Sequence, residues 1–123
     1  MTKTMIENTL YGSPLSLFTG RARSYLIKAG ISYQEKLPNS SHFKAAVLSK
    51  MGGRQSIPVL ETGLGEVIRD GAAIIDYFEA QSGHYFSPKT PRQTILNLLF
   101  DVIGCEGLLR PAMHYRWNFP EQN

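Results

Sequence analysis

The sequence predicts an α/β protein in which a small mixed sheet is followed by a helical segment. Two observations indicate this class. Short apolar strand patterns alternate with helical patterns through residue 81, in the order βαβ-αββα, and a long apolar helical pattern follows a polar linker at residues 82–89. A chain of 123 residues can form one compact domain with a core but is short for two complete ones. We therefore expect a four-stranded mixed sheet within a domain at residues 1–81, and the truncated beginning of an all-helical domain at residues 90–123.

The first elements predicted are a strand, a helix and a second strand joined by short loops. The strands are expected at residues 8–13 and 31–37 and should be parallel, as in a right-handed βαβ unit. The helix between them ends near Gly30, and its single apolar face carries Phe18, Ala22, Tyr25, Leu26 and Ala29. Ser16 lies at the N-terminus of this helix, where free N–H groups and the helix dipole favour an anion or a thiolate.

The remaining elements of the first domain are a short helix, a hairpin and a longer helix. The short helix is expected around residues 43–51. Strand patterns at residues 56–61 and 66–69 flank a Gly-rich turn and predict an antiparallel hairpin. The first of these strands contains Pro58, which is unusual because proline removes a donor from the ladder. The longer helix is expected at residues 71–81.

The last predicted helix starts at Pro91 and runs to about residue 109. Thr90, Pro91 and Gln93 give three start signals, namely an N-cap, a proline in the first turn and a capping box. Its apolar residues cover more than one face, so the helix requires partners on several sides. We expect these partners to be either further helices of a longer chain or a second subunit.

Composition and charge exclude several classes of function. The 13 basic and 10 acidic residues give a net charge of +3, and the basic residues are scattered, which argues against nucleic-acid binding but allows a small anionic ligand. Cys105 is the single cysteine, so neither an intrachain disulfide nor a Cys-x-x-Cys pair can form. The sequence shows no membrane-spanning run and no signal peptide, and the 3 histidines show no metal-ligand spacing. We expect a cytoplasmic protein without a metal.

Three short motifs accompany this order of elements. Ser16 lies five positions before the pair Arg21-x-Arg23, Ile57-Pro58 lies in the third strand pattern, and residues 70–74, DGAAI, open the helix after the hairpin. In these features, residues 9–110 resemble the glutathione S-transferase family. The resemblance implies a thioredoxin-like N-terminal domain that binds glutathione, followed by the first helix of an all-helical domain.

Ser16 has two interpretations. In the resemblance it occupies the position of the family's catalytic Tyr, Ser or Cys, so its hydroxyl would donate a hydrogen bond to the sulfur of glutathione and favour the thiolate. Its spacing alone favours an N-cap serine. The family often has proline at the next position, where this chain has Leu17.

Ile57-Pro58 is similar to the family's cis-proline dipeptide, whose first residue pairs through its main chain with the cysteinyl part of glutathione. The residues alone also allow a trans proline at a sheet edge. The resemblance further implies that Lys50, Arg54 or Gln55, in the preceding loop, binds the glycine carboxylate.

Asp70 and Gly71 correspond to the acid and serine with which the family holds the γ-glutamyl end of glutathione. Asp70 retains the acid and is also a candidate helix cap. Gly71 lacks the hydroxyl, and losing one hydrogen bond to a charged group costs about 1.5–3 kcal/mol.

The resemblance implies conjugation of the glutathione thiol to a small hydrophobic electrophile, and a homodimer. Because the family builds its electrophile site largely from C-terminal helices, we expect this chain to be an incomplete portion of the enzyme that is not competent alone. The alternative is a non-catalytic binding or structural module of the same family, which Leu17 and Gly71 favour. A thioredoxin-like redox protein is disfavoured because the turn has no cysteine.

Overall fold

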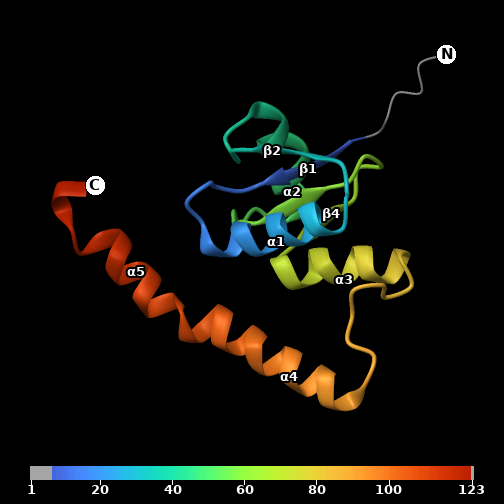
Figure 1. Ribbon diagram of the computed structural model, residues 1–123. Helices are drawn as coiled ribbons and strands as arrows, with labels where there is room; N and C mark the ends of the chain where they lie inside the picture. Colours follow the sequence, from blue (N-terminus) through green and yellow to red (C-terminus); the bar gives the residue numbers. More distant parts are fainter. Residues whose placement is uncertain (1–6, 123) are drawn as a thin grey trace. The chain divides into compact units, whose positions relative to one another are not determined.

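The computed structural model describes residues 7–122, and the chain divides after Gln81 into two compact units. The first unit contains β1 (Asn8–Tyr11), α1 (Leu17–Lys28), β2 (Tyr33–Lys36), a π-helical turn η1 (Phe43–Val47) that continues into α2 (Leu48–Lys50), β3 (Val59–Glu61), β4 (Val67–Arg69) and α3 (Gly71–Gln81) (Figure 1). The order of these elements confirms the predicted βαβ-αββα pattern. The π-helical turn was not predicted.

The four strands form one mixed sheet in the order β2-β1-β3-β4. β1 pairs with β2 in parallel, and β3 pairs antiparallel with both β1 and β4. The predicted parallel pair and hairpin are therefore confirmed. β3 is shorter than predicted and begins directly after Pro58, because proline has no N–H to donate to a neighbouring strand.

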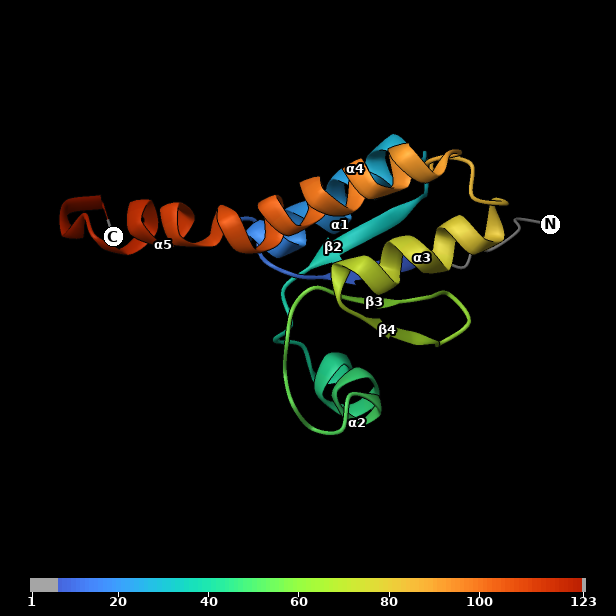
Figure 2. The ribbon, with the colours of Figure 1, turned by 90° about the horizontal axis from the view of Figure 1, so that it is seen from below.

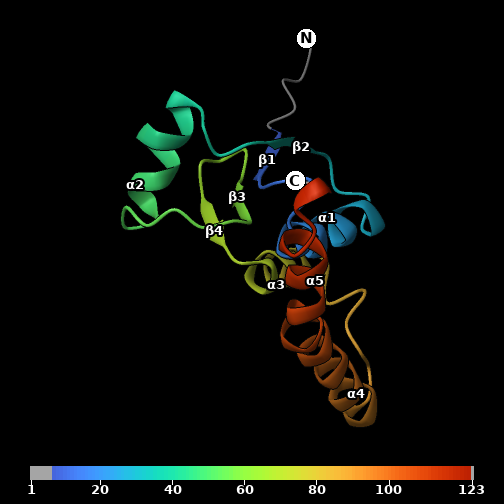
Figure 3. The same cartoon turned by 90° about the vertical axis from the view of Figure 1, so that its left-hand side faces the viewer.

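Helices cover both faces of this sheet, with α1 and α3 side by side on one face and α2 on the other (Figures 2 and 3). Since successive side chains of a strand point to opposite faces, neighbouring strand residues enter different cores. The core under α1 and α3 comprises Leu10, Ala22, Leu26, Leu60, Ile74 and Phe78. The core under α2 comprises Tyr11, Phe43, Val47, Met51 and Val59.

The second unit is helical and consists of α4 (Pro91–Val102), a π-helical turn η2 (Ile103–Gly107), α5 (Leu109–Trp117) and a 3-10 turn η3 (Pro120–Gln122). Thr90 caps α4 as predicted, and its hydroxyl accepts from the Gln93 N–H at 3.2 Å. A single helix to residue 109 was wrong. The helix is interrupted at η2, where Gly104 and Gly107 are poor helix formers, and a further helix follows.

Most large apolar side chains of this unit are exposed, as the all-round apolar pattern of its helix anticipated. They include Ile95, Leu96, Leu98, Leu99, Phe100, Val102, Ile103, Leu108, Tyr115 and Trp117. In residues 82–121, no residue is buried.

Candidate functional site

Ser16 caps α1 at the turn that follows β1. Its backbone is extended, with φ −81° and ψ 122°, and its Oγ accepts a hydrogen bond from the Thr19 N–H at 3.2 Å. The N-cap interpretation is thus confirmed. Within residues 7–122, the half-buried Ser16 hydroxyl donates no hydrogen bond. Because a hydroxyl both accepts and donates, the cap leaves its proton available to a ligand.

The cis peptide bond between Ile57 and Pro58 lies immediately before β3. Pro58 is buried, and its carbonyl accepts from the Asp70 N–H at 3.2 Å, which joins this loop to the start of α3. Ile57 is half-buried, and in the described part of the chain neither its N–H nor its carbonyl is hydrogen-bonded. An extended peptide could therefore pair with this main chain as an added strand does.

Asp70 and Gly71 form the entry to α3. Asp70 is exposed and has φ +75°, in the left-handed region that few non-glycine residues adopt, and its carbonyl accepts the Ile74 N–H at 3.0 Å. Gly71 is buried, and a Cβ placed on it would lie 3.5 Å from Arg21 Cδ and 3.7 Å from the Phe18 carbonyl oxygen. These are ordinary contacts, so the space beside Gly71 admits a small side chain.

Two of these contacts bring the three motifs together at one end of the sheet. The Asp70–Pro58 hydrogen bond joins the cis-proline loop to α3, and the approach of Gly71 to Phe18 places the start of α3 against the first turn of α1. The N-termini of α1 and α3 thus lie near a main chain with free pairing groups. This combination suits a small peptide-like anion.

The candidates for the glycine carboxylate are placed differently from one another. The Lys50 Nζ donates to the Gly65 carbonyl at 2.6 Å, in the turn between β3 and β4, which is the opposite end of the sheet from Pro58. Lys50 is therefore not brought to the three motifs. Arg54 and Gln55 are exposed, and the Gln55 Nε2 lies 3.5 Å from the Pro38 carbonyl oxygen.

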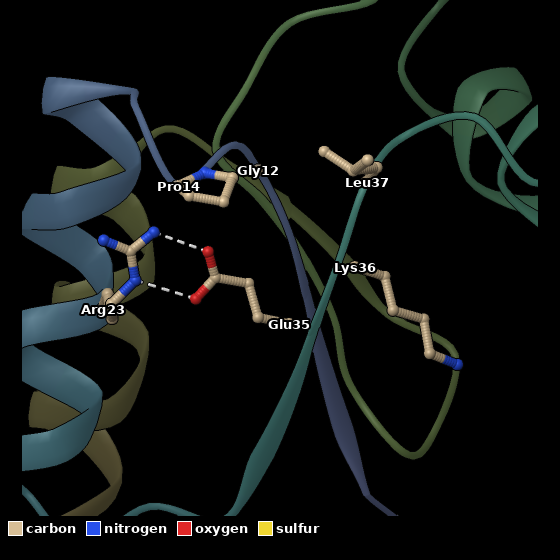
Figure 4. Close-up of a pocket in the computed structure, with 6 residues that line it drawn as sticks. All are labelled: Gly12, Pro14, Arg23, Glu35, Lys36 and Leu37. Carbon is tan, nitrogen blue, oxygen red and sulfur yellow. Dashed lines mark hydrogen bonds and ion pairs between the residues drawn. The ribbon is translucent and has the colours of Figure 1, made fainter.

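Arg23 supports the turn from the side of β2. Its Nε and Nη2 donate to the two carboxylate oxygens of Glu35 at 2.8 and 2.5 Å, and Nη2 also donates to the Ser13 carbonyl at 3.3 Å. The hydrogen bond from Arg23, opposed in part by burial, holds the pKa of Glu35 below its ordinary value. This pair borders a hollow of about 310 Å³ that is lined by Gly12, Pro14, Arg23, Glu35, Lys36 and Leu37 (Figure 4).

Tyr11 also lies close to the turn but does not belong to the candidate site. Its side chain is 2% exposed, and its ring centroid is 4.9 Å from that of Phe43 in the core under α2. Burial, followed by the negative charge of Glu61, raises the pKa of Tyr11. Its phenol is therefore a core group.

The sequence did not predict a role for Thr19 at the site, and Arg23 served only to define the distance of Ser16 from the Arg21-x-Arg23 pair. Thr19 is fully buried, and its N–H holds the Ser16 oxygen. The signal available was its place three residues after an N-cap serine, where a polar side chain commonly takes part in capping.

Within residues 7–122, no three His, Cys, Asp or Glu side chains are grouped so that they could hold a metal ion. None of the helices in that range has the length and apolar character needed to cross a membrane.

Solved structures with the same fold include three that contain glutathione. A glutathione transferase homologue from Sulfitobacter with bound glutathione is 17% identical, with a TM-score of 0.60 over 82% of this chain and 50% of its own. Glutaredoxin 2 from Salmonella typhimurium in complex with glutathione is 18% identical, with a TM-score of 0.56. The match covers 83% of this chain and 46% of the glutaredoxin chain. A glutathione S-transferase of Ceriporiopsis subvermispora in complex with glutathione is 21% identical, with a TM-score of 0.52. The match covers 77% of this chain and 44% of the transferase chain.

The chain spans about half the length of each of these structures. No curated protein matches it. The sequence model of the glutathione S-transferase N-terminal domain matches residues 10–90, which is more than half of the chain and includes all three motifs. The four-stranded mixed sheet with helices on both faces agrees with that match, and the chain belongs to the glutathione S-transferase family.

Proposed function

We propose that this chain binds glutathione at the end of the sheet where Ser16, Ile57 and Asp70 meet. We further propose that the whole protein transfers the glutathione thiol to a small hydrophobic electrophile. The convergence of the α1 turn, the cis-proline loop and the α3 entry is the observation that carries this proposal. Membership of the family and the glutathione bound in the three similar structures support it.

The sulfur of glutathione would lie at the N-terminus of α1. There the Ser16 hydroxyl would donate to the sulfur while its oxygen continues to accept from the Thr19 N–H. A hydrogen bond to the sulfur and the positive end of the helix dipole both favour the thiolate, which is the form that attacks an electrophile. The cysteinyl main chain would pair with the free N–H and carbonyl of Ile57.

The γ-glutamyl end would lie at the start of α3. The exposed carboxylate of Asp70 would bind the amino group, and the free N–H groups of the first turn would bind the α-carboxylate. The exposed Arg54 would be available to the glycine carboxylate. Since Gly71 offers no hydroxyl, we expect weaker binding than a serine at this position would give.

The test is a glutathione titration followed by backbone NMR. We expect shifts at Ser16, Ile57 and Asp70 and none at Lys50, whose ammonium is bonded to Gly65 at the other end of the sheet. If millimolar glutathione moves none of the first three signals, the proposed binding site is wrong.

The second candidate function, a binding module without turnover, is favoured by Leu17 and Gly71, the two positions at which the chain departs from the family's motifs. An assay of the whole protein for conjugation of glutathione to an aryl halide distinguishes the two. We expect Ser16→Ala to lower the rate while the shifts at Ile57 and Asp70 persist. Thr90→Ala is the matched control, because it also removes an N-cap hydroxyl, worth about 1 kcal/mol, but in the second unit. Equal rates for the parent and Ser16→Ala would favour the module.

A further inference from the structure

Thr19 fills the space beside the turn that carries Ser16. Its side chain is fully buried, and a Cβ placed on Gly12 would lie 2.3 Å from Thr19 Cγ2 and 2.6 Å from Thr19 Oγ1. Real Cβ atoms do not approach other atoms so closely. Residue 12 must therefore be glycine for its backbone to lie this close to the Thr19 side chain. The last residue before the turn and the first turn of α1 therefore fit together at this side chain.

Hydrogen bonds connect Thr19 to both ends of the same turn. Its Oγ1 accepts from the Ser13 N–H at 3.3 Å, and its own N–H donates to the Ser16 Oγ at 3.2 Å. Ser13 completes the ring, since its carbonyl accepts from the Ser16 N–H at 3.1 Å. That carbonyl also accepts from Arg23 Nη2 at 3.3 Å, which links the ring to the pair with Glu35.

We propose that Thr19 is a positioning residue for Ser16, and that its side chain fixes the direction in which the Ser16 hydroxyl is presented to the thiol of glutathione. This inference rests on the proposed function. The backbone N–H of Thr19 holds the Ser16 Oγ directly. The Thr19 hydroxyl holds the Ser13 N–H, and the Ser13 carbonyl in turn holds the Ser16 N–H. Valine has nearly the same shape but would leave the Ser13 N–H without its acceptor.

The test compares Thr19→Val with Thr19→Ser, which retains the hydroxyl. Ser24→Ala is the matched control: Ser24 lies on the exposed side of α1, and its hydroxyl donates to the Gly20 carbonyl at 2.7 Å, away from the turn. The first measurement is the pKa of the thiol of bound glutathione, followed by the ultraviolet absorbance of the thiolate. We expect Thr19→Val to raise this pKa, with about a two- to tenfold loss of thiolate at neutral pH. Thr19→Ser and Ser24→Ala should keep the parent value.

A second measurement needs no ligand. Amide hydrogen exchange at Ser13 and Ser16 should be about two- to tenfold faster in Thr19→Val than in the parent, and unchanged in the other two variants. Unchanged exchange and an unchanged thiol pKa in Thr19→Val would each overturn the positioning role. A parent protein that binds no glutathione would instead overturn the proposed function.

If Thr19→Val does not fold, Gly12→Ala tests the same point from the other side. The added methyl group must displace the Thr19 side chain, so the exchange at Ser16 should again be faster than in the parent. Parent-like exchange at Ser16 in a folded Gly12→Ala protein would contradict the inference.

Discussion

At the scale of the single residue, Ser16 shows how one hydroxyl can serve two purposes. Its oxygen accepts from the Thr19 N–H and so stabilises the start of α1, while its proton is left for a ligand. The structural and the proposed catalytic interpretations of this serine are therefore compatible. Gly71 takes the place of a serine in the motif that resembles the family's, and a Cβ added there would make only ordinary contacts.

We predict that Gly71→Ser increases the affinity for glutathione. A Cβ at this position would have neighbours at 3.5 and 3.7 Å, so the added carbon fits, and we expect the new hydroxyl to bind the charged γ-glutamyl end. One hydrogen bond to a charged group corresponds to about 1.5–3 kcal/mol, or about a 10- to 100-fold change in the dissociation constant measured by calorimetry. Gly71→Ala is the control, because it adds the carbon without the hydroxyl. Equal affinities of the serine and alanine variants would contradict the prediction.

At the scale of the element, a bidentate ion pair between Arg23 and Glu35 connects α1 to β2. The same guanidinium reaches the Ser13 carbonyl, so this pair holds both the helix and the turn that precedes it. The two side chains are 28% and 25% exposed. Water therefore screens their attraction, and we expect a contribution in the range of surface pairs, about 0.2–1 kcal/mol.

We predict that this contribution depends on pH. Arg23 lowers the pKa of Glu35 in the folded chain, so its stabilisation is complete above the ordinary glutamate pKa of about 4.3 and is lost as the pH falls through the lower, folded-state value. Glu35→Gln should therefore lower the free energy of unfolding at pH 7 and have little effect well below pH 4, as measured by urea denaturation. Glu66→Gln is the control, because Glu66 accepts from the Tyr77 hydroxyl and has no ion pair within residues 7–122. An effect of Glu35→Gln that is the same at both pH values would rule out the ion pair as its cause.

At the scale of the whole chain, the two units differ in how they are stabilised. The first unit has two cores, one on each face of its sheet, and both are built entirely from residues 10–78. In the second unit, residues 82–121 contain no buried residue, and large apolar side chains of α4 and α5 are exposed. Cooperative unfolding requires buried apolar area, so it should be a property of the first unit.

We predict that residues 1–81 fold without the second unit. Their amide NMR spectrum should match the corresponding signals of the full chain for the residues of both cores, and their thermal unfolding should remain cooperative. Residues 82–123 alone should unfold gradually, because isolated short helices are marginally stable in water. A fragment 1–81 with collapsed amide dispersion would show that the second unit is needed for folding.

The sequence by itself determined the order of the strands and helices in the first unit, the N-caps Ser16 and Thr90, and the hairpin, because these follow from spacing and from hydrogen bonds between residues close in the chain. It also determined the parallel pair, because a strand, a helix and a second strand joined by short loops form a βαβ unit. The candidate site was predicted from motifs that resemble those of a family. Periodicity alone predicts only that Ser16 is a helix N-cap. The local sequence pattern did not predict the helices of the second unit correctly, because it gave one continuous helix and not the interruption at η2.

Only the tertiary structure decided which distant residues meet. It placed Thr19 in the space beside Gly12, the first turn of α1 against Gly71, and Lys50 at the end of the sheet away from Pro58. Such contacts depend on how faces pack and on where each side chain finds room, and neither property is contained in a pattern of a few consecutive residues. The sequence therefore determined what each motif could do alone, and the packing of α1 and α3 on one sheet decided that they could act together.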